Sequence, residues 1–162
     1  MKYIDIFKLL NENEIKYLIV GGLAVNMHGY SRFTADIDVI IDLEDDNILR
    51  LITLLLKLGY KPKLPVNPID FAKKEIREDW IKNKNMKAFN FYNEKELISE
   101  FDIVIMEKRD FEKMYKDRIE YDIDGLKIPI INIDDLIKMK ELANRSIDKI
   151  DVEKLRIIKG IK

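Results

Sequence analysis

Two aspartates separated by one residue form the part of this sequence best suited to chemistry. Asp36 and Asp38 lie in the β-branched run 36–42, which predicts a strand. Alternate residues of a strand point to the same face, so both carboxylates share one side while Ile37 points toward the core. Mg²⁺ prefers one or two carboxylates together with phosphate oxygens and water, so the pair suits a metal–triphosphate complex. The alternative is a half-exposed strand with a charged outer face.

A glycine doublet lies upstream of the two aspartates. A strand predicted over residues 17–20 ends in Gly21 and Gly22, and a short helix predicted over 23–27 follows. The free N–H groups at the start of a helix favour anions, and glycine lets a phosphate approach the backbone closely. The alternative is a plain tight turn, for which glycine is the default residue.

A third acid, Asp102, lies in an aliphatic strand predicted over residues 101–105. An ionised side chain is costly to bury without a partner. A metal ion is one partner that Asp102 could have, and solvent at an exposed part of the sheet is the other.

Composition excludes several kinds of chemistry. The chain has no cysteine and one histidine, His28, which excludes disulfides, thiolate zinc sites and zinc held by several imidazoles. No G-x-S-x-G motif accompanies that histidine, which we expect to cap or pack. Lys and Arg total 29 against 30 acidic residues, so no global positive field attracts nucleic acid. Carboxylates, lysines, arginines and backbone amides remain for chemistry.

Helices and strands alternate along the rest of the chain. Helices are predicted over about 4–13, 44–58, 67–83, 110–118, 133–143 and 152–160, strands over 86–92 and within 97–106, and a hairpin over 121–131 that turns at Asp124-Gly125. This order predicts an α+β fold, close to α/β in its alternation, with a C-terminal helical pair. The length of 162 residues predicts one domain over 1–162, with a core of about 1–131 and a helical segment of about 132–162.

The sequence also predicts a cytoplasmic protein with no membrane partner. No stretch approaches the roughly 18 consecutive apolar residues of a membrane span. Lys8, Asn11 and Glu12 interrupt the N-terminal apolar residues, which argues against a signal peptide.

The glycine doublet, the aspartate pair and Asp102 together resemble the nucleotidyltransferase superfamily with the DNA polymerase beta-like fold. Gly21-Gly22 is followed by 13 residues and then by Asp36-Ile37-Asp38, with the third carboxylate in a later strand. The resemblance covers about residues 15–156 and implies a central mixed sheet flanked by helices. Two departures are that the doublet is Gly-Gly rather than Gly-Ser, which leaves no serine hydroxyl for phosphate, and that Asn144 replaces the usual glycine.

A longer set of residues is similar to one small subgroup, which includes abortive-infection-type nucleotidyltransferase toxins. The set adds His28, Arg32, Thr34, Pro129, Asp135, Leu136, Lys138, Lys140, Ala143, Arg145, Asp148 and Leu155.

The resemblance implies transfer of a nucleoside monophosphate from a nucleoside triphosphate (NTP) to a hydroxyl, with two Mg²⁺ ions for which Mn²⁺ can substitute. Asp36, Asp38 and Asp102 would hold one ion, which activates the acceptor hydroxyl, and the first two aspartates would hold a second at the pyrophosphate. The amides of Gly21 and Gly22 would orient the phosphates. The implied acceptors are RNA, including a tRNA 3′ end, or a protein side chain within a toxin–antitoxin pair, whose cognate protein would be a partner.

Four further side chains are candidates for the triphosphate. Arg32 and Thr34 lie between the glycines and the aspartates, and a guanidinium matches phosphate bidentately. Lys140 and Arg145 lie on and after the first C-terminal helix. Simple surface solvation is the alternative for these charged side chains.

Two other functional interpretations stay open, and so does the role of Trp80. A nucleotide-binding module without turnover, or an antitoxin partner, would keep the same residues. A Rossmann dinucleotide binder would share the strand–glycine–helix opening, but G-x-G-x-x-G is absent. Helical spacing of Ile69, Ala72, Ile76 and Trp80 predicts Trp80 as a core anchor, and RNA binding by Trp80 with its neighbouring lysines is the alternative.

Overall fold

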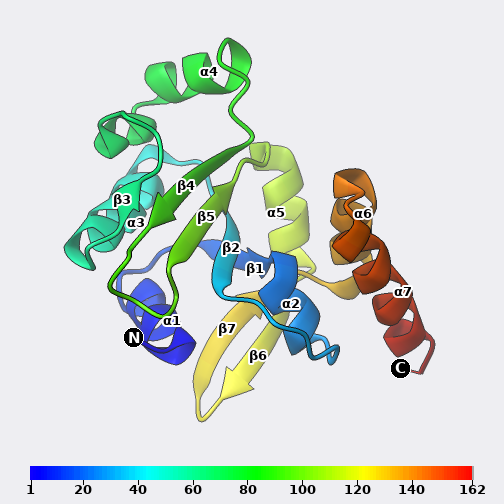
Figure 1. The fold of residues 1–162 in the computed structure, drawn as a ribbon. Coiled ribbons are helices and arrows are strands. Elements are labelled where there is room, and N and C mark those ends of the chain that lie inside the picture. The colour runs from blue at the N-terminus through cyan, green and yellow to red at the C-terminus, as the bar shows by residue number, and fades with distance from the viewer. Residues whose placement is uncertain (162) are drawn as a thin grey trace.

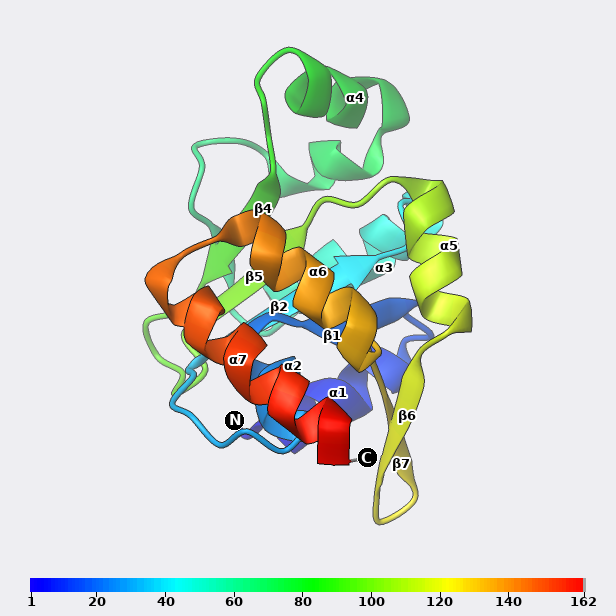
Figure 2. The same ribbon diagram turned by 90° about the vertical axis from the view of Figure 1, so that its right-hand side faces the viewer.

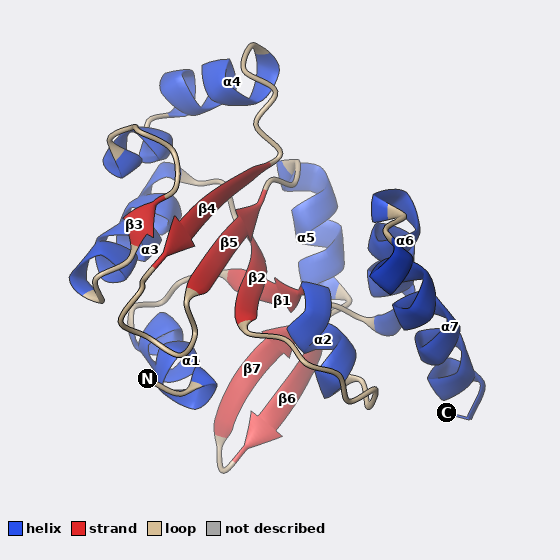
Figure 3. Cartoon of the chain, in the orientation of Figure 1, coloured by secondary structure: helices blue, strands red, loops and turns tan. Residues whose placement is uncertain are grey.

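A mixed sheet of seven strands forms the centre of the computed structural model, which describes residues 1–161 (Figures 1 and 3). The strands are β1 (Tyr17–Val20), β2 (Asp36–Ile41), β3 (Lys61–Pro62), β4 (Ala88–Tyr92), β5 (Glu100–Val104), β6 (Ile119–Ile123) and β7 (Leu126–Ile130). Their order is β3-β4-β5-β2-β1-β7-β6. The pairs β2–β5 and β1–β7 are parallel, and the other neighbours are antiparallel. The α+β prediction is therefore confirmed.

Helices flank the sheet on both sides. They are α1 (Tyr3–Glu12), α2 (Gly21–Met27), α3 (Asp45–Lys57), α4 (Lys74–Lys82), α5 (Lys108–Lys116), α6 (Ile133–Ala143) and α7 (Ser146–Ile161), with a 3₁₀ helix, η1 (Pro68–Ala72). Figures 1 and 2 show α6 and α7 side by side, next to α2 and away from α3 and α4. None of the helices in residues 1–161 is long and apolar enough to cross a membrane.

At strands β4 and β5 the core lies against one face of the sheet. Phe91 and Phe101 are fully buried there, and Phe89 contacts both Phe71 and Trp80, with ring centroids 5.0 Å and 5.8 Å away. Trp80 is only 7% exposed, which confirms its prediction as a core anchor. Because strand side chains alternate, the residues between these aromatics lie on the opposite, more open face, where the acids are found.

The helix predicted over 67–83 is instead two elements. Asn67 caps the first, its side chain accepting a hydrogen bond from the Ile69 N–H at 3.2 Å, but the chain is extended at Lys73 (φ −85°, ψ 114°). The buried Arg77 donates to the Phe71 carbonyl at 2.9 Å, taking an acceptor that a continuous helix would use itself. A side chain of the next helix thus takes a backbone acceptor at the end of η1.

Two other helix starts differ from the sequence prediction. Gly21 and Gly22 form the first turn of α2 rather than a turn before it. The last helix begins at Ser146 rather than at about 152, because Asp148 accepts a hydrogen bond from the Arg145 N–H at 3.1 Å and stabilises the opening turn. The Asp124-Gly125 hairpin turn is confirmed, with both residues at positive φ.

Candidate active site

The three aspartates singled out in the sequence come together on the open face of the sheet. Strands β2 and β5 are parallel neighbours, and their register places Asp38 beside Asp102 and Asp36 beside Glu100. On the next strand, β4, Asn90 is the partner of Asp102. These residues form a polar row across three strands, which we call the acid row: Asp36, Asp38, Glu100, Asp102 and Asn90.

Burial and mutual repulsion shift the acidities of the acid row. Burial, then the charges of Asp102 and Asp36, raise the pKa of Asp38 to about 6, against the opposing effects of Lys140 and the Gly22 N–H. Burial also raises the pKa of Asp36 and of Asp102. Negative charge is therefore concentrated where solvent screens it poorly, an environment that a cation would stabilise.

The glycine doublet makes room for functional side chains. Gly21 has φ +64°, and a Cβ placed on it would lie 2.0 Å from Oδ2 of Asp38. A Cβ on Gly22 would lie 2.7 Å from a guanidinium nitrogen of Arg32 and 2.9 Å from Oγ1 of Thr34. The Gly22 N–H donates to Asp38, so in this structure the doublet serves the carboxylate as an anion site.

The donor set fits a hard divalent cation. The Oδ1 atom of Asp102 is buried and has no hydrogen-bond partner, so the acid row contains an unsatisfied acceptor atom. Within residues 1–161, no three His, Cys, Asp or Glu side chains are grouped closely enough to hold one ion between them. Two carboxylates completed by phosphate oxygens and water are the usual Mg²⁺ environment, and Asp38 with Asp36 or Asp102 can supply them.

Two of the cations predicted for the triphosphate are engaged by acids of α7. The Arg32 guanidinium pairs with Asp151, with Nε 2.9 Å from Oδ1 and Nη2 3.1 Å from Oδ2. Lys140 lies between Asp148 and Asp151, with Nζ–O distances of 3.0 Å and 2.9 Å. Both acids are fully buried and Lys140 is 3% exposed, so Arg32 ties the loop after α2 to α7, and Lys140 ties α6 to α7.

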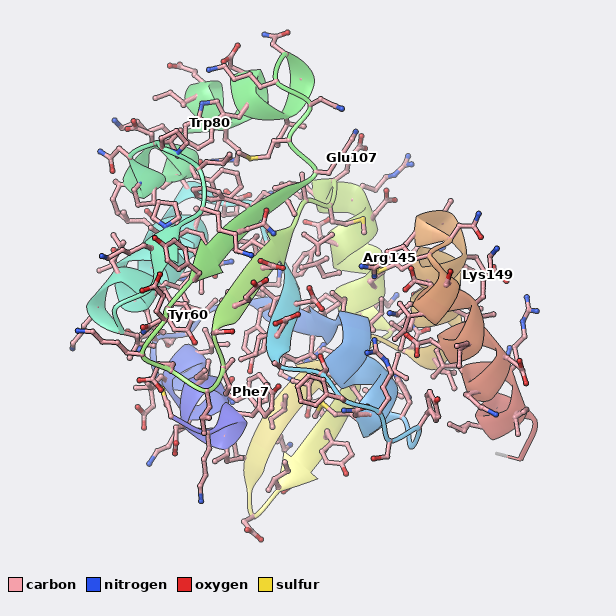
Figure 4. All side chains as sticks on the ribbon, in the orientation of Figure 1. Phe7, Tyr60, Trp80, Glu107, Arg145 and Lys149 are labelled. Atoms are coloured by element: carbon pink, nitrogen blue, oxygen red, sulfur yellow. The ribbon has the colours of Figure 1, made fainter. Side chains whose placement is uncertain are left out.

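Arg145 is the predicted cation best placed to meet a phosphate. Its Nε donates to Asp148 at 2.7 Å, yet its side chain is 69% exposed. It lines a cleft of about 230 Å³ together with Gly21 and Asp38. Figure 4 shows it on the side of α6 that faces the sheet. Thr34 is half-buried, and its carbonyl accepts a hydrogen bond from the Tyr3 hydroxyl at 3.0 Å.

Sequence reasoning missed five groups at this site, two of which are Glu100 and Asn90 of the acid row. It assigned no role to Asp148 and did not single out Asp151, although their i, i+3 spacing on a helix places both on one face. It also missed Lys63, whose Nζ lies 2.8 Å from a Glu100 carboxylate oxygen. No local signal indicates Lys63, because the short strand β3 brings it there. His28 packs as expected, with Nε2 2.8 Å from the Ile131 carbonyl oxygen.

Comparisons with known proteins agree with this fold. A lincosamide antibiotic adenylyltransferase, LnuA, solved with lincomycin bound, has a similar fold, with a TM-score of 0.66 and 18% identity over 96% of this chain and 94% of that chain. An antigenic nucleotidyltransferase-like protein from Paracoccidioides brasiliensis gives 0.56 and 16% over 96% and 72% of the two chains. No curated protein matches the chain in sequence. A family model described as "Nucleotidyltransferase of unknown function (DUF6036)" matches residues 2–162.

Proposed function

The chain belongs to that family of nucleotidyltransferases of unknown function, and from this premise we propose that it transfers a nucleoside monophosphate from an NTP to a hydroxyl acceptor in a metal-dependent reaction. ATP is the donor we favour, because the similar fold of LnuA is that of an adenylyltransferase. The abortive-infection subgroup and a toxin–antitoxin role stay predictions of the sequence resemblance, as do RNA and protein acceptors.

The observation that supports this proposal best is the register of β2 and β5. It places Asp38 beside Asp102 in a buried, mutually repelling pair, with Gly21 so close to Asp38 that no side chain fits between them. An acid pair that serves only as a solvated strand face has no need of such close packing. A site that must neutralise its charge with a bound cation accounts for it.

Each element of the site has a role in the proposed transfer. Asp38, together with Asp36 or with Asp102, would hold Mg²⁺, which when bound neutralises the triphosphate and lowers the pKa of the acceptor hydroxyl. The acceptor oxygen forms a bond to the α-phosphorus, the α–β phosphoanhydride bond breaks, and pyrophosphate leaves. Asp102, with its unsatisfied Oδ1, accepts the hydroxyl proton. Arg145 orients the phosphates from the cleft that it lines with Gly21 and Asp38.

Pyrophosphate release tests the proposal directly. Wild type is incubated with each NTP, Mg²⁺ and candidate acceptors, beside the Asp38→Asn and Lys149→Ala variants. We expect release that requires Mg²⁺, falls at least a hundredfold in Asp38→Asn and is unchanged in Lys149→Ala. Tight Mg²⁺-dependent NTP binding without release for any acceptor would instead favour the nucleotide-binding module.

A further inference from the structure

A second and larger cleft, of about 600 Å³, lies at the β4 side of the acid row. It is bounded by the segment after β3 and by the chain that links α4 to β4, both visible in Figure 1. The residues that line it are Lys63, Leu64, Pro65, Val66, Trp80, Lys84, Asn85, Met86, Lys87, Ala88 and Asn90. Its volume is within the range of about 300–1,000 Å³ that is typical of small-molecule sites.

Two side chains connect this cleft to the acid row. Asn90 lines the cleft and hydrogen-bonds Asp102, which lowers the pKa of that carboxyl against the effect of burial. Lys63 lines the cleft and pairs with Glu100 at 2.8 Å. The Lys63 N–H also donates to the Asn90 carbonyl at 2.9 Å, so the two are fixed side by side. The cleft therefore meets the acid row at Asn90, the neighbour of Asp102 on β4.

The walls of the cleft combine apolar and positively charged surface. Leu64, Pro65, Val66, Trp80, Met86 and Ala88 supply apolar contacts, and no carboxylate is among the lining residues. Within residues 1–161, the Lys87 ammonium has no carboxylate within 4.0 Å, and the nearest to Lys84 is that of Asp79 at 3.9 Å. The unpaired ammonium of Lys87 and the distantly paired one of Lys84, beside an apolar wall, complement a ligand that has an apolar body and an anionic group.

Charge also argues for a small ligand rather than an RNA strand. An RNA path needs a basic groove that follows several phosphates. Here the lysines form one cluster, and a strand leaving it toward Asp102 would meet the carboxylates of Glu100 and Asp36.

We propose that this larger cleft binds the acceptor, a small organic molecule with an apolar body, a carboxylate or phosphate near Lys84 and Lys87, and a hydroxyl directed toward Asp102. Calling the ligand an acceptor rests on the proposed function, whereas the existence of the binding site does not. In the transfer, the hydroxyl oxygen bonds to the α-phosphorus of the NTP, pyrophosphate leaves, and the proton passes to Asp102.

The only tryptophan of the chain, Trp80, lines the cleft and provides a binding signal that needs no activity. We would titrate the intact protein with three nitroaromatic quenchers: 4-nitrophenyl phosphate, 4-nitrobenzoate and the neutral 4-nitrobenzyl alcohol. We expect saturable quenching by at least one anion, and the stronger of the two identifies whether phosphate or carboxylate is preferred. The Lys84→Glu/Lys87→Glu variant should weaken that anion at least tenfold and leave the neutral alcohol unchanged.

A matched control is Lys82→Glu, an exposed lysine of α4 outside the cleft, which should change the affinity less than twofold. Thermal melting of each variant checks that it is folded. Non-saturating quenching that is equal in all variants would overturn the proposal, as would saturable, lysine-dependent quenching by single-stranded oligouridylate alone.

Two further arms separate this inference from the proposed function. The Asp38→Asn variant should retain probe binding, so a protein without transferase activity can still confirm the binding site. Saturating ATP with Mg²⁺ should leave the probe bound. Displacement of the probe by ATP would show that the cleft is part of the nucleotide site and would contradict its assignment to the acceptor.

Discussion

The ionised carboxylate of Asp38 destabilises the folded chain. Its pKa is raised from 3.8 to about 6, chiefly by burial and then by Asp102 and Asp36. A carboxyl whose pKa is higher in the folded than in the unfolded state destabilises the fold when ionised. That cost is complete above about pH 6 and disappears as the pH falls toward 3.8.

Removing the Asp38 charge should therefore stabilise the metal-free protein. A shift from 3.8 to about 6 corresponds to about 3 kcal/mol. We expect Asp38→Asn to increase the free energy of unfolding by up to that amount at pH 7.5, and by about half as much at pH 5. Urea denaturation in EDTA measures both values. An equal difference at the two pH values, or destabilisation at pH 7.5, would contradict the electrostatic account.

Gly21 should tolerate no side chain. A Cβ there would lie 2.0 Å from Oδ2 of Asp38, so Gly21→Ala must displace the carboxylate, and misplacement of about 1 Å can cost roughly a hundredfold in rate. We expect a loss of that size in kcat/KM, measured by pyrophosphate release. Gly125→Ala is the matched control, because Gly125 also has positive φ (+86°) but nothing within 4 Å. Comparable losses in both variants would show that backbone strain, not contact with Asp38, is responsible.

At the residue scale the sequence predicted the acids of the site but not the ion pairs that surround them. Asp36, Asp38 and Asp102 stand out because charged residues interrupt aliphatic strands. The pairing of Arg32 with Asp151, 119 residues apart, depends on how α7 packs, which no local pattern encodes. For that reason sequence reasoning assigned Arg32 and Lys140 to phosphate, while the structure engages both with α7.

At the scale of elements, α7 is fastened to the site by buried ion pairs. Lys140→Met should leave the fully buried Asp148 and Asp151 without this counter-charge, at a cost of about 3–5 kcal/mol in the free energy of unfolding. Lys138→Met, two residues away on the same helix, removes an exposed ammonium 3.2 Å from Asp135 and should cost less than about 1 kcal/mol. Urea denaturation of both variants measures the two losses in the free energy of unfolding. Equal losses would mean that the buried ion pairs do not hold α7 in place.

The junction of α6 and α7 should contribute to nucleotide affinity through Arg145. Because its side chain is 69% exposed while it lines the smaller cleft with Asp38, we expect Arg145→Ala to weaken Mg²⁺-dependent NTP binding about tenfold, the value of one hydrogen bond to a charged group. Lys149→Ala is the control, since Figure 4 shows this lysine on the outer side of α7. Unchanged NTP affinity in Arg145→Ala would remove Arg145 from the nucleotide site.

Most elements could be predicted from apolar periodicity, but some boundaries could not. Strands β1 and β2 and helix α6 lie where their patterns place them. The interruption at Lys73 and the early start of α7 depend on side chains, Arg77 and Asp148, that take over backbone hydrogen-bonding groups. Hydrophobic periodicity does not detect such hydrogen bonds between side chains and the backbone.

At the scale of the whole molecule, the acid row lies between two clefts. The smaller one includes Gly21 and Arg145, and the larger one includes Asn90 and Lys63. A nucleotide and an acceptor could thus approach Asp38 and Asp102 from opposite sides. The fold class was predictable from the alternation of elements, whereas the strand order, which places β5 beside β2 across about sixty residues of chain, was indicated only by family resemblance.

Isothermal titration calorimetry of the four NTPs, with and without Mg²⁺, tests whether the acid row binds a metal–triphosphate complex. It would be made on wild type and on a folded Asp36→Asn/Asp38→Asn variant. We expect at least one NTP to bind wild type only with Mg²⁺ and the variant to lose this binding. Binding of equal strength without Mg²⁺, or in the variant, would contradict a metal–triphosphate site at the acid row.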